Sequence, residues 1–128
     1  MATFKRSVIL AGLALVFIAG SPWTAPAARA RTAFDGNWSV LVVTNSGSCD
    51  RAYRYALHIY DGRISYDDPS IAVSGRVTPR GYVHVTVSAG GQSASGSGHL
   101  SADSGEGRWN GHSSTSACSG YWQAERRG

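Results

Sequence analysis

From residue 36 onward, apolar and polar residues alternate with a period of two in eight short segments. This alternation indicates half-buried β-strands, because successive side chains of a strand point to opposite faces of the sheet. Clusters of Gly, Asn, Asp, Ser and Pro separate the segments, and Asp61-Gly62 is a strong hairpin signal. No segment after residue 30 has a helical period, so we expect one all-β domain. The expected strands are 36–44, 52–60, 63–66, 71–77, 82–88, 92–100, 107–111 and 117–125.

The number of strands and the two cysteines together predict how the sheet closes. We expect an antiparallel meander that closes as a barrel, with a two-sheet sandwich as the alternative. In a meander of eight strands the last runs antiparallel to the first, so the end of one lies beside the start of the other. Cys49 and Cys118 stand at those two positions. We therefore predict that they form a disulfide across the seam, which for a loop of this length contributes about 4 kcal/mol.

Tryptophan follows glycine at an interval of two in three places of the predicted domain. A buried tryptophan contributes a large apolar surface to a small domain, and a nearby glycine lets another chain segment approach closely. The segment 92–100 is rich in Ser and Gly, and its expected inner face carries small residues that suit packing under a large aromatic ring. The predicted structural anchors are Gly36, Trp38, Trp109, Gly120 and Trp122.

The first 30 residues have the pattern of a secretory signal peptide. Lys5 and Arg6 precede an apolar run over 8–19, which is too short to span a bilayer, and Ala28-Arg29-Ala30 matches a signal-peptidase site. We expect cleavage after Ala30 and a domain of residues 31–128 that is exported to the periplasm or beyond. An exported domain with two cysteines fits an oxidising compartment.

Charge argues against a nucleic-acid partner. The chain has 12 basic and 8 acidic residues, but Lys5, Arg6 and Arg29 lie in the predicted signal peptide. The remaining nine arginines and eight acidic residues leave a net charge of about +1. A near-neutral domain lacks the broad positive surface of nucleic-acid-binding proteins. The predicted strands also offer no continuous lipid-facing apolar band, so we do not expect an integral membrane protein.

Motifs of catalysis and metal binding are missing from the sequence. The four histidines have no metal-ligand spacing, and no serine stands in a Gly-x-Ser-x-Gly elbow. Most carboxylates occur in turn clusters, where turn geometry accounts for them. We therefore expect no enzyme, no metal ion and no cofactor.

The second and fifth predicted strands suggest a recognition surface. Tyr53, Tyr55 and Leu57 are expected to fill the inner face of strand 52–60. Exposed aromatic and arginine side chains are typical of recognition surfaces, so we predict binding to an envelope or extracellular protein or glycan. An inhibitor of an exported enzyme and a haem-binding protein with two converging histidines are the alternatives. The predicted surface residues are Arg54, His58, Tyr82 and His84.

Three segments resemble those of a group of small exported proteins of α-proteobacteria, some of which are labelled exoproteins of haem utilisation or adhesion. The group has no established activity, so the resemblance implies no functional residues. It covers most of the chain after the predicted signal peptide. The segments are Phe34-Asp35-Gly36-Asn37-Trp38-Ser39-Val40, Cys49-Asp50-Arg51-Ala52-Tyr53-Arg54-Tyr55 and Cys118-Ser119-Gly120-Tyr121-Trp122-Gln123-Ala124-Glu125-Arg126.

A second similarity is to the lipocalin-like barrels. The early Gly36-x-Trp38 and the late Arg126 resemble the tryptophan and arginine that close one end of those barrels. Lipocalins are longer, so a chain of this length is expected to leave little room for a ligand cavity. Small periplasmic protease inhibitors also have eight-stranded barrels with one disulfide, but their cysteines are much closer together in sequence.

Overall fold

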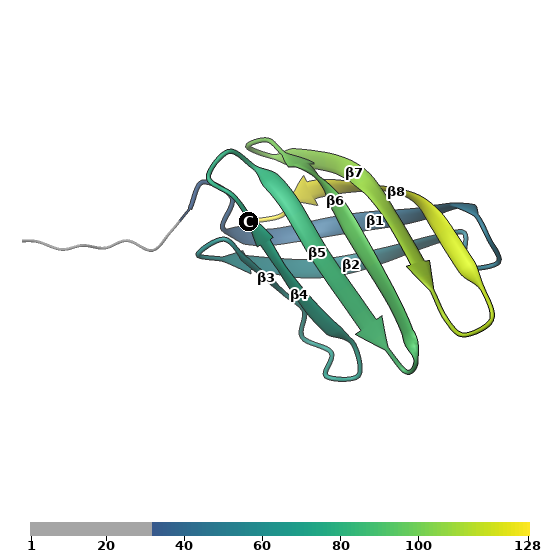
Figure 1. Cartoon of the computed structure of the whole chain (residues 1–128). Helices are drawn as coiled ribbons and strands as arrows, with labels where there is room; N and C mark the ends of the chain where they lie inside the picture. The colour runs from purple at the N-terminus through teal and green to yellow at the C-terminus, as the bar shows by residue number, and fades with distance from the viewer. Residues whose placement is uncertain (1–31) are drawn as a thin grey trace, which may run out of the picture. The chain divides into compact units, whose positions relative to one another are not determined.

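The computed structural model describes residues 32–128, and the predicted signal peptide and its cleavage site lie outside the described residues. Eight antiparallel strands form a closed barrel (Figure 1), in which each strand pairs with its sequence neighbours and the first pairs with the last. The predicted meander and its closure are confirmed, and the sandwich alternative is wrong. The strands are β1 (Gly36–Ser46), β2 (Ala52–Tyr60), β3 (Arg63–Ser65), β4 (Ala72–Val77), β5 (Tyr82–Ala89), β6 (Gln92–Leu100), β7 (Ser104–His112) and β8 (Ala117–Arg126).

The largest difference from the expected strands is at the start of β7. The sequence Asp103-Ser104-Gly105 predicts a turn, but Ser104 already pairs with Glu125 of β8. Gly105 pairs with Leu100 of β6 and Ala124 of β8. A Cβ on this glycine would clash with the Leu100 side chain. Gly105 therefore allows close packing inside the sheet. Its residue type alone does not distinguish this role from a place in a turn.

The β1–β8 seam has the register that the cysteine positions require. Val42 pairs with Trp122 and Thr44 with Gly120, and a β-bulge follows between Thr44 and Ser46. The Cys49–Cys118 disulfide is formed, with a Cα–Cα distance of 6.2 Å. It connects the chain just after β1 to the start of β8, so the seam of the barrel is closed covalently at one end.

The core lies inside the barrel and is built from the alternate, inward-facing residues of the strands. Half-buried residues pack around it, including Val40, Val85 and Trp109. Among residues 32–128, no helix is present that is long and apolar enough to cross a membrane. The buried core residues are Phe34, Trp38, Ile59, Ile64, Val77, Val83, Leu100, Trp122 and Ala124.

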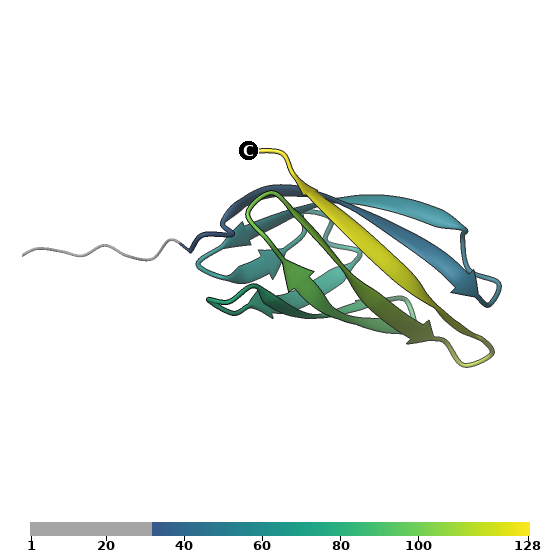
Figure 2. The ribbon, with the colours of Figure 1, turned by 90° about the horizontal axis from the view of Figure 1, so that it is seen from above.

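The two ends of the barrel are built differently, as the two views together show (Figures 1 and 2). Because the strands form a meander, every second connection lies at the same end. The connections 47–51, 66–71, 90–91 and 113–116 surround one end, which we call the mouth. The connections 61–62, 78–81 and 101–103 lie at the other end, together with residues 32–35 and the C-terminus.

Candidate functional site

The end of the barrel away from the mouth is closed by Trp38 and the residues just before β1. Trp38 is 2% exposed, and its Nε1 donates a hydrogen bond to the Phe34 carbonyl oxygen at 2.9 Å. The Arg126 guanidinium lies 4.8 Å from the centre of the Trp38 ring. It also donates hydrogen bonds to the carbonyl oxygens of Asp35 and Ala33, each at 2.7 Å. These contacts hold the segment across the barrel end.

Asp35 ties this closing segment to the β2–β3 turn. Its carboxylate accepts hydrogen bonds from the Thr32 hydroxyl and from the backbone N–H groups of Asp61 and Gly62. Burial raises the pKa of Asp35, but the hydrogen bonds from Thr32, Asp61 and Gly62 outweigh it, so the net pKa is lowered. Gly36, with a φ of 141°, follows at once and lies against Gly128, where no side chain fits.

Behind this closed end lies an apolar inner chamber of about 110 Å³. Its wall is made of inward-facing residues of every strand except β4. No charged side chain lines it within residues 32–128. The lining residues are Trp38, Val40, Val42, Tyr55, Leu57, Ile59, Ile64, Val83, Val85, Gly96, Leu100, Trp109, Trp122 and Ala124.

Trp122 and three glycines shape one wall of the inner chamber. The Trp122 ring packs so closely over β6 and β7 that a Cβ on Gly98 would lie 2.5 Å from its Cζ2, and one on Gly107 2.6 Å from its Cε2. Gly96 lines the chamber beside it. The Trp122 side chain is 6% exposed, and its Nε1 has no hydrogen-bond partner within residues 32–128. The expected packing of small β6 residues under an aromatic ring is therefore present.

A wider outer chamber of about 580 Å³ lies at the mouth. It shares Val42, Tyr55 and Trp109 with the inner chamber, so the two adjoin along the barrel. Residues from all four mouth connections, or from their immediate flanks, line it. They include Asp50, Ile71, Gln92 and Ser113. The outer chamber mixes polar and apolar groups, whereas the inner chamber is apolar.

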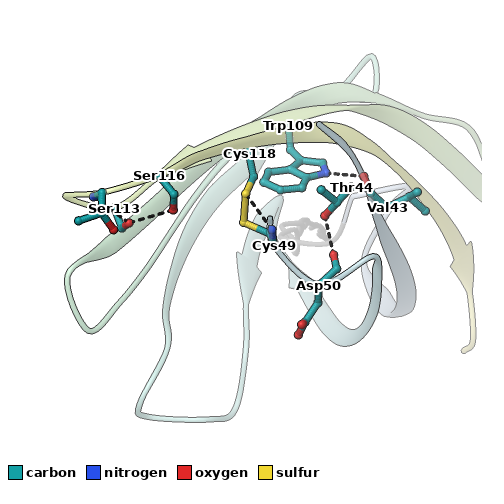
Figure 3. The surroundings of a disulfide bond; sticks show 9 residues. Val43, Thr44, Cys49, Asp50, Trp109, Ser113, Ser116 and Cys118 are labelled. Atoms are coloured by element: carbon teal, nitrogen blue, oxygen red, sulfur yellow. Dashed lines mark hydrogen bonds between the residues drawn. A yellow bond between two sulfur atoms is a disulfide. The ribbon is translucent and has the colours of Figure 1, made fainter. Parts of the chain in front are cut away.

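The disulfide forms part of the rim of the mouth (Figure 3). Cys49 and Cys118 both line the outer chamber, and the Trp109 indole lies beside them. Trp109 Nε1 donates a hydrogen bond to the Val43 carbonyl oxygen at 2.9 Å, which connects β7 to β1 across β8. The Thr44 hydroxyl donates to the Asp50 carbonyl oxygen at 2.6 Å. These bonds fix one side of the rim.

Three tyrosines stand on the β2 side of the mouth. The rings of Tyr53 and Tyr55 meet edge to face, with centroids 5.0 Å apart, and those of Tyr55 and Tyr66 do so at 5.5 Å. Burial raises the pKa of Tyr55, and the neighbouring Tyr53, Tyr66 and Asp50 raise it further. Tyr53, expected in the core, faces inward but is 53% exposed, because its position on β2 lies at the open mouth.

The residues predicted to form a recognition surface all lie outside the barrel, but in two separate pairs. Arg54 and His58 belong to β2, whereas Tyr82 and His84 belong to β5, with β3 and β4 between them. Arg54 donates a hydrogen bond to the Ser39 hydroxyl at 3.0 Å. Two strands of the barrel therefore separate the two pairs, and their use as a recognition surface stays a prediction.

The four histidines lie at three places, with His84 and His99 on the outer faces of the adjacent strands β5 and β6. His58 contacts Asn37 at 2.7 Å and Asp67 at 3.0 Å, and His99 packs edge-on against Tyr82. His84 lies on the outer face of β5, and His112 lines the outer chamber. Within residues 32–128, no group of three or more His, Cys, Asp or Glu side chains is placed to hold a metal ion.

Sequence reasoning missed the two chambers, and the expectation of little room for a cavity is corrected. The available signals were Gly96 of β6 and Gly111 of β7, inward glycines that line the inner and the outer chamber respectively. Comparison of the chain with protein-family models, with curated proteins and with solved structures found no match. The chambers and their lining are therefore the basis for any functional conclusion.

Proposed function

We propose that this chain is an exported binding protein that holds one small, largely apolar ligand inside its barrel. The observation that carries the proposal is the apolar inner chamber, which adjoins a wider chamber at the mouth. The interior of an eight-stranded barrel is either filled by side chains or holds one small ligand. An unfilled apolar space of this kind supports the second use.

The two chambers define the shape of the ligand. Apolar cavities on the order of 150 Å³ bind molecules of the size of benzene, so the inner chamber of about 110 Å³ fits a short apolar group. The outer chamber of about 580 Å³ lies in the usual range for small-molecule sites. We infer an elongated ligand whose apolar end lies behind Tyr55 and whose polar end lies at the mouth.

Two observations support an exported location for this binding protein. The Cys49–Cys118 disulfide belongs to the kind of bond that persists in oxidising compartments. The segment 1–30 has the sequence pattern of a signal peptide. Neither observation names the compartment, which is the periplasm or the outside of the cell.

Binding through the outer surface is less well supported. Arg54 and His58 are separated by two strands from Tyr82 and His84, and neither pair adjoins a chamber. The exported-enzyme inhibitor and the haem-binding protein with two converging histidines are the alternatives from the sequence. The interior chambers favour neither of them.

The test is to fill the inner chamber and measure binding of an apolar fluorescent probe. Val85 lines the chamber from β5 and is half-buried, so Val85→Phe places a ring in the empty space. Thr86 is the next residue on the same strand and is exposed, which makes Thr86→Phe a matched control. With the uncharged dye N-phenyl-1-naphthylamine, we expect saturable one-to-one binding by the parent chain and by Thr86→Phe. We expect at least tenfold weaker binding by Val85→Phe.

Thermal unfolding monitored by circular dichroism checks that both variants are folded. If Val85→Phe does not fold, Val40→Phe fills the same chamber from β1. Equal dye binding by the chamber-filling variant and the parent chain contradicts the proposal. Turnover of an ester, glycoside or peptide by the purified chain would replace it with an enzymatic function.

A further inference from the structure

The tyrosine cluster at the mouth places two aromatic rings, Tyr53 and Tyr55, in the wall of the outer chamber. Tyr53 and Tyr55 are nearly perpendicular, at 87°, and Tyr55 and Tyr66 meet at 80°. These edge-to-face contacts hold the rings against one another, and a ring face that stays exposed attracts quaternary ammonium groups within about 6 Å of its centroid. Tyr53 and Tyr55 line the outer chamber, and Tyr53 is more than half exposed. An exposed ring of this size at a cavity mouth is available to a ligand.

A carboxylate stands at the same opening. Asp50 is the one acidic side chain that lines the outer chamber within residues 32–128, and it forms no ion pair there. Its charge acts on the Tyr55 hydroxyl, as one of the causes of the raised pKa of that tyrosine. Asp50 therefore lies close enough to add negative potential to the space beside the rings.

The basic residues of the domain lie elsewhere. None of the arginines at positions 51 to 127 lines either chamber. Arg51 follows Asp50 in the chain but is not part of the chamber wall. His112 is the basic side chain at the mouth, and it lines the outer chamber. A domain of nearly neutral net charge thus combines electron-rich rings and an unpaired carboxylate at its opening.

We propose that the ligand is a cationic amphiphile, with a quaternary ammonium head group held beside Tyr53, Tyr55 and Asp50 and a short apolar tail in the inner chamber. This inference rests on the proposed function and adds the chemistry of the head group to it. The weakly hydrated methyl groups of such a cation contact ring faces, while its charge is balanced by the carboxylate. An anionic head group would instead meet the unpaired Asp50 without an arginine to offset it.

The experiment compares three amphiphiles with the same tail and different head groups. Octyltrimethylammonium, octyl glucoside and octyl sulfate are titrated into the purified, oxidised chain by calorimetry, below their micelle concentrations. We expect the trimethylammonium compound to bind about tenfold more tightly than the glucoside, and the sulfate to bind most weakly. Tenfold corresponds to about 1.4 kcal/mol, which is within the range of one cation–π contact.

Matched variants assign the preference to the proposed groups. Tyr53→Leu and Asp50→Asn should each remove most of the preference for the cation, while Tyr53→Phe, which keeps the ring, should retain it. Glu106→Gln removes the same charge from an exposed position on β7, away from the mouth, and should leave the preference unchanged. All of these variants alter exposed side chains, so they are expected to fold.

The outcomes separate this inference from the proposed function. Binding of the glucoside with no preference for the cation, or a preference for the sulfate, overturns the cationic head group and leaves the binding protein in place. A preference that survives both Tyr53→Leu and Asp50→Asn overturns the assignment to this site. Failure of all three compounds to bind the folded chain overturns the proposed function and this inference together.

Discussion

Replacement of Trp38 by alanine should remove the closed end of the barrel. Trp38 has the lowest exposed fraction of the buried core residues, and its ring lies between the core and the Arg126 guanidinium. Its Nε1 is also the hydrogen-bond partner of the Phe34 carbonyl oxygen. The substitution therefore creates a cavity, leaves a buried acceptor without its partner and removes the surface on which Arg126 packs.

The magnitude follows from these three losses. Truncation of a buried tryptophan to alanine costs about 3–5 kcal/mol, and loss of a buried hydrogen-bond partner costs about 1–3 kcal/mol. The losses overlap because they occur at one side chain, so we expect a decrease in the free energy of unfolding of about 4 kcal/mol. A small domain has a total of about 5–15 kcal/mol. At about 4–8 °C per kcal/mol, the melting temperature should fall by about 20 °C.

The assay is urea and thermal denaturation followed by tryptophan fluorescence and circular dichroism. Trp38→Phe is the matched variant, because it keeps an aromatic ring and removes the Nε1 donor. It should lose about 1–3 kcal/mol of stability, the cost of leaving one buried acceptor without its partner. An unchanged midpoint for Trp38→Ala would refute the view that this residue holds the barrel end. If Trp38→Ala kept the midpoint of the parent chain but lost ligand binding, Trp38 would be a residue of ligand recognition.

Three further predictions concern the packing, the acid sensitivity and the seam. Gly107→Ala should lower stability by about 1–3 kcal/mol in urea denaturation, since the new Cβ would clash with the Ser97 carbonyl oxygen and press on Trp122; an unchanged midpoint would contradict this packing. The pKa of Asp35 is lowered in the folded state. The Asp35 carboxylate therefore contributes fully to the stability of the fold above pH about 3.8, its ordinary pKa, and this contribution is lost as the pH falls below that value. Asp35→Asn should therefore flatten the acid limb of a stability–pH curve, and an unaltered limb would count against the three hydrogen bonds to its carboxylate. Reduction of the Cys49–Cys118 disulfide should lower stability by about 2–4 kcal/mol, and equal stability with and without dithiothreitol would contradict a stabilising seam.

The alternation of apolar and polar residues was enough to predict the strands and the faces of most side chains. The even number of strands and the positions of Cys49 and Cys118 predicted the closed seam. These signals succeed because a strand has a fixed side-chain period and a disulfide requires its two ends to be close. The predicted start of β7 was wrong because Ser104 and Gly105 are residue types typical of turns but pair with β8 in the sheet.

The chambers could not be predicted for a different reason. The alternation of residues predicts which side chains face inward. The unfilled volume inside the barrel depends on the summed sizes of the inward side chains that all strands contribute at each position along the barrel axis. Likewise, Arg126 holds the closed end by hydrogen bonds to the carbonyl oxygens of Ala33 and Asp35. Every residue has a backbone carbonyl oxygen, so the sequence does not identify these two as the acceptors. The recognition surface stays a prediction: alternation places its residues on the outer side of β2 and β5, but it does not state that β3 and β4 separate those strands around the barrel.

The position of the disulfide has a consequence for the order of folding. Every pairing in the barrel joins strands that are neighbours in sequence, except β1 with β8. The neighbouring pairs close short loops, whereas the pairing of β1 with β8 must overcome the entropy of nearly the whole domain. Cys49 and Cys118, 69 residues apart, meet only when that last pairing forms. Oxidation of these two thiols therefore records the completion of folding, and a chain with free thiols has either not closed its barrel or not met an oxidant.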